Sequence, residues 1–165
     1  MLNLEFRDFA LICKNGHMVN SSVTKDKEYN VDFCEECGAK TIKWCENCKT
    51  MISGTKYIDD IAIFTQEVPK YCGGCGKPYP WTQAKLESVN ELVDLMDELD
   101  EKEKDILKQS AVEISTNNPK TEVGVLKIKK YLSKLGSVAA DTFKEVIVQV
   151  ASETAIKYME KQGMV

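Results

Sequence analysis

The sequence predicts an α+β protein in which small β-hairpins and cysteine knuckles precede a C-terminal bundle of about four α-helices. Two observations favour this fold class. All seven cysteines and the only histidine fall in the first half of the chain, in closely spaced pairs. The second half has neither residue type and instead places apolar side chains at three- and four-residue steps, the period of an amphipathic helix. We therefore predict two domains, residues 1–81 and residues 82–165, divided where the composition shifts.

The cysteines and the histidine form four close pairs, which we call the first to fourth knuckles. Cys13 and His17 make the first knuckle, and the other six cysteines make three C-x-x-C pairs. Such pairs are typical of structural zinc sites, each of which takes four protein ligands. Eight ligands fill two sites and leave none over. The predicted ligands are Cys13, His17, Cys34, Cys37, Cys45, Cys48, Cys72 and Cys75.

Other uses of these cysteines fit the pattern less well. An odd number of thiols cannot all close as disulfides, and chance burial of cysteine does not produce three C-x-x-C pairs. Iron–sulfur chemistry remains a second interpretation, because a four-thiolate site also suits iron. We predict two Zn²⁺ ions as cofactors, with iron as the alternative.

Two groupings of the ligands are compatible with the spacing. A cross-braced arrangement would combine the first knuckle with the third and the second with the fourth. Sequential zinc ribbons are favoured, because an aromatic residue followed by Cys-x-x-Cys-Gly closes each half of the region, at residues 33–38 and 71–76. The sequential groups are Cys13, His17, Cys34 and Cys37 for one ion, and Cys45, Cys48, Cys72 and Cys75 for the other.

Short strands are predicted around these knuckles. Residues 4–12 are aromatic and branched enough for one strand that runs into Cys13, and Asn15-Gly16 is a turn dipeptide that brings the chain back toward His17. Residues 18–31 are expected to form the hairpin of the first ribbon, and residues 49–70 a longer excursion in the second. Four side chains of this excursion need burial, for which the helical half offers a surface: Ile58, Ile61, Ile63 and Phe64.

Four helices are predicted in the second half. The first extends from a cap at Thr82 to Leu99, and the second begins after Asp100 with Glu103 at the capping-box position. The third covers about residues 120–135 and ends at Gly136. The last runs from about residue 138 to residue 161, and its apolar positions cover an arc too wide for one helix of a bundle to bury.

Composition and charge restrict the function and the location. The formal net charge is −4 and neither half is basic, which disfavours a protein that neutralises many phosphates. No apolar run is long enough for a membrane span, and charged residues among the first eleven do not resemble a signal peptide. Reduced thiols without an export signal indicate the cytoplasm.

The eight ligand positions occur together with three shorter segments of the helical half, namely Leu99-Asp100-Glu101, Asn118-Pro119-Lys120-Thr121 and Ala151-Ser152-Glu153-Thr154-Ala155. In this combination the chain resembles a family of short bacterial double-zinc-ribbon proteins of unknown function. The resemblance covers almost the whole chain. It implies a cytoplasmic, non-enzymatic zinc protein and brings no established activity with it.

The leading hypothesis is a non-enzymatic zinc-binding interaction or scaffold module that binds a protein partner or itself, as a component of a larger bacterial assembly. Val148 and Ile156, on the wide apolar arc of the last predicted helix, are the candidate interaction surface. The alternative is a nucleic-acid-binding ribbon, in which basic and aromatic side chains contact phosphates and bases. The candidate contacts are Lys40, Lys43, Trp44, Lys49, Lys56 and Tyr57.

An enzyme is the least favoured class. A catalytic zinc ion keeps an open position for water, whereas all eight ligands are needed to fill two closed sites. No nucleophile–base pair or phosphate-binding loop lies outside the metal ligands. No small-molecule substrate is therefore evident from the sequence.

Overall fold

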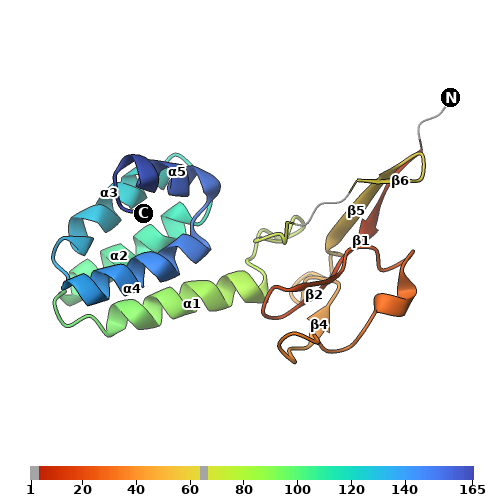
Figure 1. The fold of residues 1–165 in the computed structure, drawn as a ribbon, viewed down its shortest axis with the longest axis horizontal. Helices are drawn as coiled ribbons and strands as arrows, with labels where there is room; N and C mark the ends of the chain where they lie inside the picture. The colour runs from red at the N-terminus through yellow and green to blue at the C-terminus, as the bar shows by residue number, and fades with distance from the viewer. Residues whose placement is uncertain (1–3, 64–66) are drawn as a thin grey trace. The chain divides into compact units, whose positions relative to one another are not determined.

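The computed structural model of the protein describes residues 4–63 and 67–165. The chain forms two compact units, Met1–Gln83 and Ala84–Val165, which we call the β unit and the helical unit. Short antiparallel strands and all the cysteines belong to the β unit, and α-helices build the helical unit (Figure 1). The predicted α+β fold class is confirmed. Phe64 of the predicted excursion lies outside the described residues.

Two three-stranded antiparallel sheets make up the β unit, and each combines strands that are distant in sequence. The first sheet has the order β1-β5-β6 and the second the order β3-β2-β4. A short 3-10 helix, η1 (Lys27–Tyr29), lies between β3 and β4 in the chain. The strands are β1 (Glu5–Phe9), β2 (Leu11–Cys13), β3 (Met18–Asn20), β4 (Thr41–Ile42), β5 (Ser53–Ile58) and β6 (Ile61–Ile63).

The single strand predicted at residues 4–12 is two strands, because the chain leaves the first sheet and enters the second at Ala10. This residue is fully buried, and its N–H donates to the carbonyl oxygen of Ile52 at 2.8 Å. β5 passes very close at this point, since a Cβ atom on Gly54 would lie 2.6 Å from the carbonyl carbon of Phe9. Only glycine fits such a crossing.

β5 and β6 form a hairpin whose turn is Asp59-Asp60. Both turn residues have positive φ, 49° and 63°, as a two-residue type I′ turn requires and as aspartate tolerates. Ile58 is half-buried, whereas Ile61 and Ile63 are 70% and 45% exposed. Two of the side chains that we expected to need burial, Ile61 and Ile63, are therefore left exposed.

One apolar core connects the two halves of the β unit. Trp81 stacks on Tyr79 with ring centroids 4.7 Å apart, and its indole N–H donates to the carbonyl oxygen of Pro69 at 2.8 Å. Gly16 of the first knuckle lies beside this indole, since a Cβ atom there would be 2.9 Å from Cβ of Trp81. The buried members of the core are Ala10, Ile12, Ile42, Cys45, Ile52, Cys72, Tyr79 and Trp81.

Five α-helices follow the β strands in sequence. The predicted capping box is confirmed, because Asp100 accepts a hydrogen bond from the Glu103 N–H at 2.9 Å and the Glu103 carboxylate accepts one from the Asp100 N–H at 3.2 Å. Within the described residues, every helix falls short of the length and apolarity that a membrane span needs. The helices are α1 (Pro80–Asp94), α2 (Glu101–Ile114), α3 (Thr121–Leu132), α4 (Ser137–Val150) and α5 (Glu153–Lys161).

The last predicted helix is in fact two helices, α4 and α5, separated at Ala151 and Ser152. Both residues have extended ψ angles, 145° and 159°. The Ser152 N–H donates to the carbonyl oxygen of Ile114 at 2.8 Å, and the Ser152 hydroxyl accepts from the Ala155 N–H at 3.2 Å. Because the chain turns here, α4 and α5 each bury their own apolar side in the helical core. The apolar positions of two helices therefore account for the arc that is too wide for the single helix predicted at about residues 138–161.

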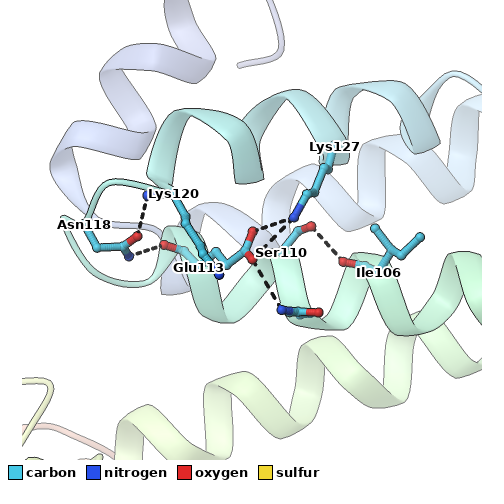
Figure 2. Close-up of polar contacts among 7 residues, drawn as sticks. Ile106, Ser110, Glu113, Asn118, Lys120 and Lys127 are labelled. Atoms are coloured by element: carbon cyan, nitrogen blue, oxygen red, sulfur yellow. Dashed lines mark hydrogen bonds and ion pairs between the residues drawn. The ribbon is translucent and has the colours of Figure 1, made fainter.

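Hydrogen bonds fix the connection between α2 and α3 (Figure 2). The Asn118 side-chain amide donates to the carbonyl oxygen of Glu113 at 2.7 Å and accepts from the Lys120 N–H at 2.8 Å. The buried Glu113 carboxylate receives the Lys127 ammonium of α3 at 3.0 and 3.3 Å. A Cβ atom on Gly124 would lie 2.8 Å from Cγ2 of Ile114, so glycine allows the two helices to approach closely.

Candidate metal centres

The structure brings the eight predicted ligands together in two groups of four. Within each group the candidate ligand atoms all lie within 4.8 Å of one another. The groups are Cys13, His17, Cys34 and Cys37, and Cys45, Cys48, Cys72 and Cys75. The sequential grouping is thus confirmed and the cross-braced arrangement is wrong.

The first centre has the dimensions of a tetrahedral ion site. His17 Nδ1 lies 3.5 Å from the sulfur of Cys13 and 3.6 Å from that of Cys34, and the sulfurs of Cys13 and Cys37 are 3.7 Å apart. A tetrahedral ion with metal–sulfur bonds of about 2.3 Å and metal–nitrogen bonds of about 2.0 Å would separate these atoms by roughly 3.5 to 3.8 Å. One ion therefore fits between the four side chains.

The second centre has the same spacing with four sulfurs. Cys45 and Cys75 are 3.7 Å apart at their sulfur atoms, and Cys48 and Cys72 are 3.6 Å apart. A disulfide would shorten such a distance to about 2.0 Å, and all seven cysteines are free. The donor set and the spacing again fit one tetrahedral ion.

The three C-x-x-C knuckles share one backbone pattern. The N–H of the first cysteine, Cys34, Cys45 or Cys72, donates to the carbonyl oxygen five residues later at 2.8 to 2.9 Å. Its own carbonyl oxygen accepts from the N–H four residues later, also at 2.8 to 2.9 Å. The aromatic residue before it pairs with the chain beyond the knuckle in an isolated bridge, as Phe33 with Lys40, Trp44 with Met51 and Tyr71 with Pro78.

The third member of this repeat is hidden in the sequence. The residue after the second cysteine takes the left-handed conformation in every case, with φ of 70° at Gly38, 64° at Lys49 and 71° at Gly76. Glycine marks two of these positions, but lysine occupies the third. The sequence pattern therefore marks only two copies of the repeat, although the aromatic residue Trp44 before Cys45 is a signal for the third.

Nearby donors favour the thiolate form of two ligands. The backbone N–H of Ala39 is the main cause that lowers the pKa of Cys37 to about 6, and Asn15 adds a side-chain hydrogen bond to the same sulfur at 3.4 Å. The Gly74 N–H, 3.3 Å from the sulfur of Cys72, lowers the pKa of that thiol to about 6. Metals bind the thiolate, so these donors prepare the two centres for an ion.

The ring of His17 is oriented from its far side. Its Nε2 lies 3.5 Å from a carboxylate oxygen of Glu36, whereas Nδ1 faces the sulfurs. Contacts with the thiols of Cys34 and Cys37 raise the pKa of His17 above its ordinary value, and the Glu36 charge adds to the effect. A carboxylate near the outer nitrogen favours the tautomer in which Nδ1 is free to bind a metal.

Residues 6–159 match the sequence profile of a family described as "Uncharacterized protein conserved in bacteria (DUF2321)". The chain belongs to this family. The DUF2321 match includes all eight candidate ligands and reaches into α5, so the predicted resemblance to a bacterial family of unknown function is confirmed. No curated protein and no solved structure is significantly similar to the chain.

The candidate nucleic-acid contacts divide into two sets. Lys40, Lys43 and Trp44 line one groove of the β unit. The other three lie outside it: Lys49 donates to the carbonyl oxygen of Glu46, Lys56 pairs with Glu5 at 3.0 Å, and Tyr57 is buried with its ring stacked on Phe6. Because the Tyr57 hydroxyl also bonds to Ser22 at 2.7 Å, its ring belongs to the fold and is not open to a base.

The candidate interaction surface of the last predicted helix is split between two helices. Val148 lies on α4 and Ile156 on α5, and both are half-buried against the helical core. Two neighbouring residues on these helices, Ile147 and Ala155, are fully buried. Most of the apolar arc is thus covered within the helical unit.

Proposed function

We propose that this protein is a non-enzymatic zinc protein in which two closed zinc sites hold the β unit in shape for binding a protein partner. The observation that carries the proposal is the pair of complete four-ligand groups at tetrahedral spacing. Four protein ligands leave no open position for water, which a catalytic zinc ion needs. Such sites supply structure, and the protein then acts as a component of a larger assembly in the bacterial cytoplasm.

The open face of the β1-β5-β6 sheet supports binding to a protein. Ile58 pairs with Ile61, and Ile63 pairs with Lys56, so the three isoleucines lie on one face of the sheet. Lys56 and Glu5 form an ion pair on the same face. Exposed isoleucines beside charged side chains are the composition of a protein-binding patch with a polar rim.

The zinc part of the proposal is tested by elemental analysis of the purified protein. We expect two zinc equivalents per chain and one equivalent in the variants His17→Ala and Cys45→Ser, each of which breaks one centre. Iron in place of zinc, or a single equivalent in the unaltered protein, would refute it.

The binding part is tested by affinity capture from a lysate of the source bacterium, followed by identification of the captured protein. The double variant Ile61→Lys/Ile63→Lys should lose that protein, while Val138→Lys, which places a lysine on an 80% exposed valine of the helical unit, should retain it. If both variants capture the protein equally, this face of the sheet is not the binding surface. If the protein is a monomer and captures no partner, the proposed binding function is refuted.

A second candidate function is nucleic-acid binding. One observation favours it, the placement of Lys40, Lys43 and Trp44 around a single groove. Two cations next to an exposed indole combine phosphate neutralisation with base stacking.

A further inference from the structure

A groove of about 430 Å³ lies in the β unit. Its lining comes from strand β2 with Lys14 just after it, from the connection that precedes the second knuckle, and from the segment between Lys40 and Glu46, which includes β4. Its volume falls near the lower end of the roughly 300 to 1,000 Å³ typical of small-ligand pockets. This volume is enough for one small ligand.

The charged side chains of the groove leave an excess of positive charge. Lys14 and Glu46 neutralise each other in an ion pair of 2.8 Å. Among the residues that the structure describes, Lys40 and Lys43 make no ion pair with a carboxylate. Asp32 is the one other acid that lines the groove. Two lysines against one aspartate favour an anionic ligand.

The aromatic side chain of the groove is partly open to solvent. Trp44 is 39% exposed, whereas Trp81, the other tryptophan of the chain, is 4% exposed in the core. The Lys43 ammonium lies 5.4 Å from the centroid of the Trp44 ring. A planar apolar surface and a cation therefore stand side by side in the same groove.

We propose that this groove binds one nucleotide, with its base stacked on Trp44 and its phosphate neutralised by Lys40 and Lys43. A nucleotide joins a flat aromatic group to an anion within one small molecule, which matches this juxtaposition. Inorganic phosphate would use the lysines alone. The inference rests on the second candidate function and specifies that the groove binds a nucleotide. This nucleotide can be free or can be one nucleotide of a single strand.

The test uses the zinc-loaded full chain and three probes. These are AMP, inorganic phosphate, and a fluorescent oligothymidylate of about ten nucleotides, a length within the range of single-strand binding sites. Binding is followed by calorimetry or anisotropy, and quenching of tryptophan emission reports stacking. We expect AMP or the oligonucleotide to bind and quench, and phosphate alone to bind more weakly and without quenching.

Variants assign the binding to the groove. Trp44→Leu should weaken binding at least about fivefold, the lower end for loss of one stacked base, and abolish the quenching. Lys40→Ala/Lys43→Ala should reduce the salt slope of oligonucleotide binding by about 1.4, the value for two phosphates on a single strand. Metal content and circular dichroism verify that each variant is folded. If Trp44→Leu loses its zinc, binding by the lysine variant, which keeps Trp44 in place, decides.

Matched controls come from the same chain. Phe33→Leu changes an exposed aromatic residue at the equivalent place before a C-x-x-C pair, but Phe33 does not line the groove. Lys27→Ala/Lys102→Ala removes the same charge at two exposed positions outside the groove. Both controls should bind like the unaltered protein.

The outcomes separate the inference from the function on which it rests. Groove-dependent binding of AMP without the oligonucleotide supports the inference and overturns nucleic-acid binding. Groove-dependent binding of the oligonucleotide supports both. If the groove variants bind the oligonucleotide as the controls do, the inference is overturned and the nucleic-acid function stands at another surface. If neither AMP nor the oligonucleotide binds, both are overturned.

Discussion

Lys49 holds the backbone conformation that glycine holds in the two sister knuckles. A left-handed residue other than glycine is strained, by about 1 kcal/mol. Lys49→Gly should therefore raise the free energy of unfolding of the β unit by up to about 1 kcal/mol, measured by denaturant unfolding of the metal-loaded protein.

The reverse change provides the control. Gly76 has the same φ, and a Cβ atom there would have no neighbour within 4 Å, so Gly76→Lys tests the backbone alone. It should destabilise the β unit by a similar amount. A stabilising Gly76→Lys, or a destabilising Lys49→Gly, would contradict the idea that the three knuckles are equivalent.

Asp8 is a buried carboxylate that the backbone holds ionised. Burial raises its pKa, but hydrogen bonds from the N–H groups of Phe9, Thr24 and Lys25 and from the Thr24 side chain outweigh burial, so the pKa lies below its ordinary value of 3.8. A depressed pKa adds stability that is complete above the unfolded-state pKa and is lost as the pH falls through the folded-state pKa.

Asp8→Asn should lower the free energy of unfolding at pH 7 by about 1 to 3 kcal/mol, because the three N–H donors lose a charged acceptor. The difference from the unaltered protein should shrink as the pH falls below the ordinary aspartate pKa. Denaturant unfolding at several pH values measures it, with Asp26→Asn, an exposed aspartate, as the comparison. A difference that stays constant down to acid pH would rule out the charge as the cause.

At the scale of elements, the break between α4 and α5 depends on Ser152. Its hydroxyl caps α5 by accepting from the Ala155 N–H. Ser152→Ala should cost about 1 kcal/mol of stability in the helical unit, the usual value for loss of an N-cap, measured by thermal unfolding. Ser137→Ala, at the exposed first position of α4, should change little. If Ser152→Ala leaves the stability unchanged, the backbone hydrogen bond to Ile114 alone determines where α4 and α5 separate.

This break also shows where prediction from the sequence ends. The candidate metal ligands and their sequential grouping were predictable, because the spacing within each pair is local and few residue types bind zinc. The capping box at Asp100 was also predictable, because its two residues lie only three positions apart in the sequence. Ala151 and Ser152, in contrast, are compatible with a continuous helix, and a bond to Ile114 on another helix decides their conformation. The groove around Trp44 likewise combines segments that only the fold brings together.

At the scale of the whole molecule, metal removal should affect the two units differently. The helical unit has a core without any metal ligand, whereas Cys45 and Cys72 belong to the core of the β unit. A chelator should change the emission of Trp81 in that core, while most of the helical circular dichroism signal persists. The contrary result is loss of the helical signal in parallel with metal release, which would make the chain one cooperative unit.

The position of Trp81 has a consequence for how the two ions bind. Its side chain lies beside Gly16 of the first knuckle, and its ring stacks on Tyr79 in the core that contains two candidate ligands of the second centre. An ion that binds at one centre therefore also orders this shared indole. The entropic cost of ordering the indole is then smaller when an ion binds at the second centre. We therefore expect zinc uptake by the apo-protein to be positively cooperative, with a Hill coefficient above one and fewer half-loaded molecules than two independent sites would give.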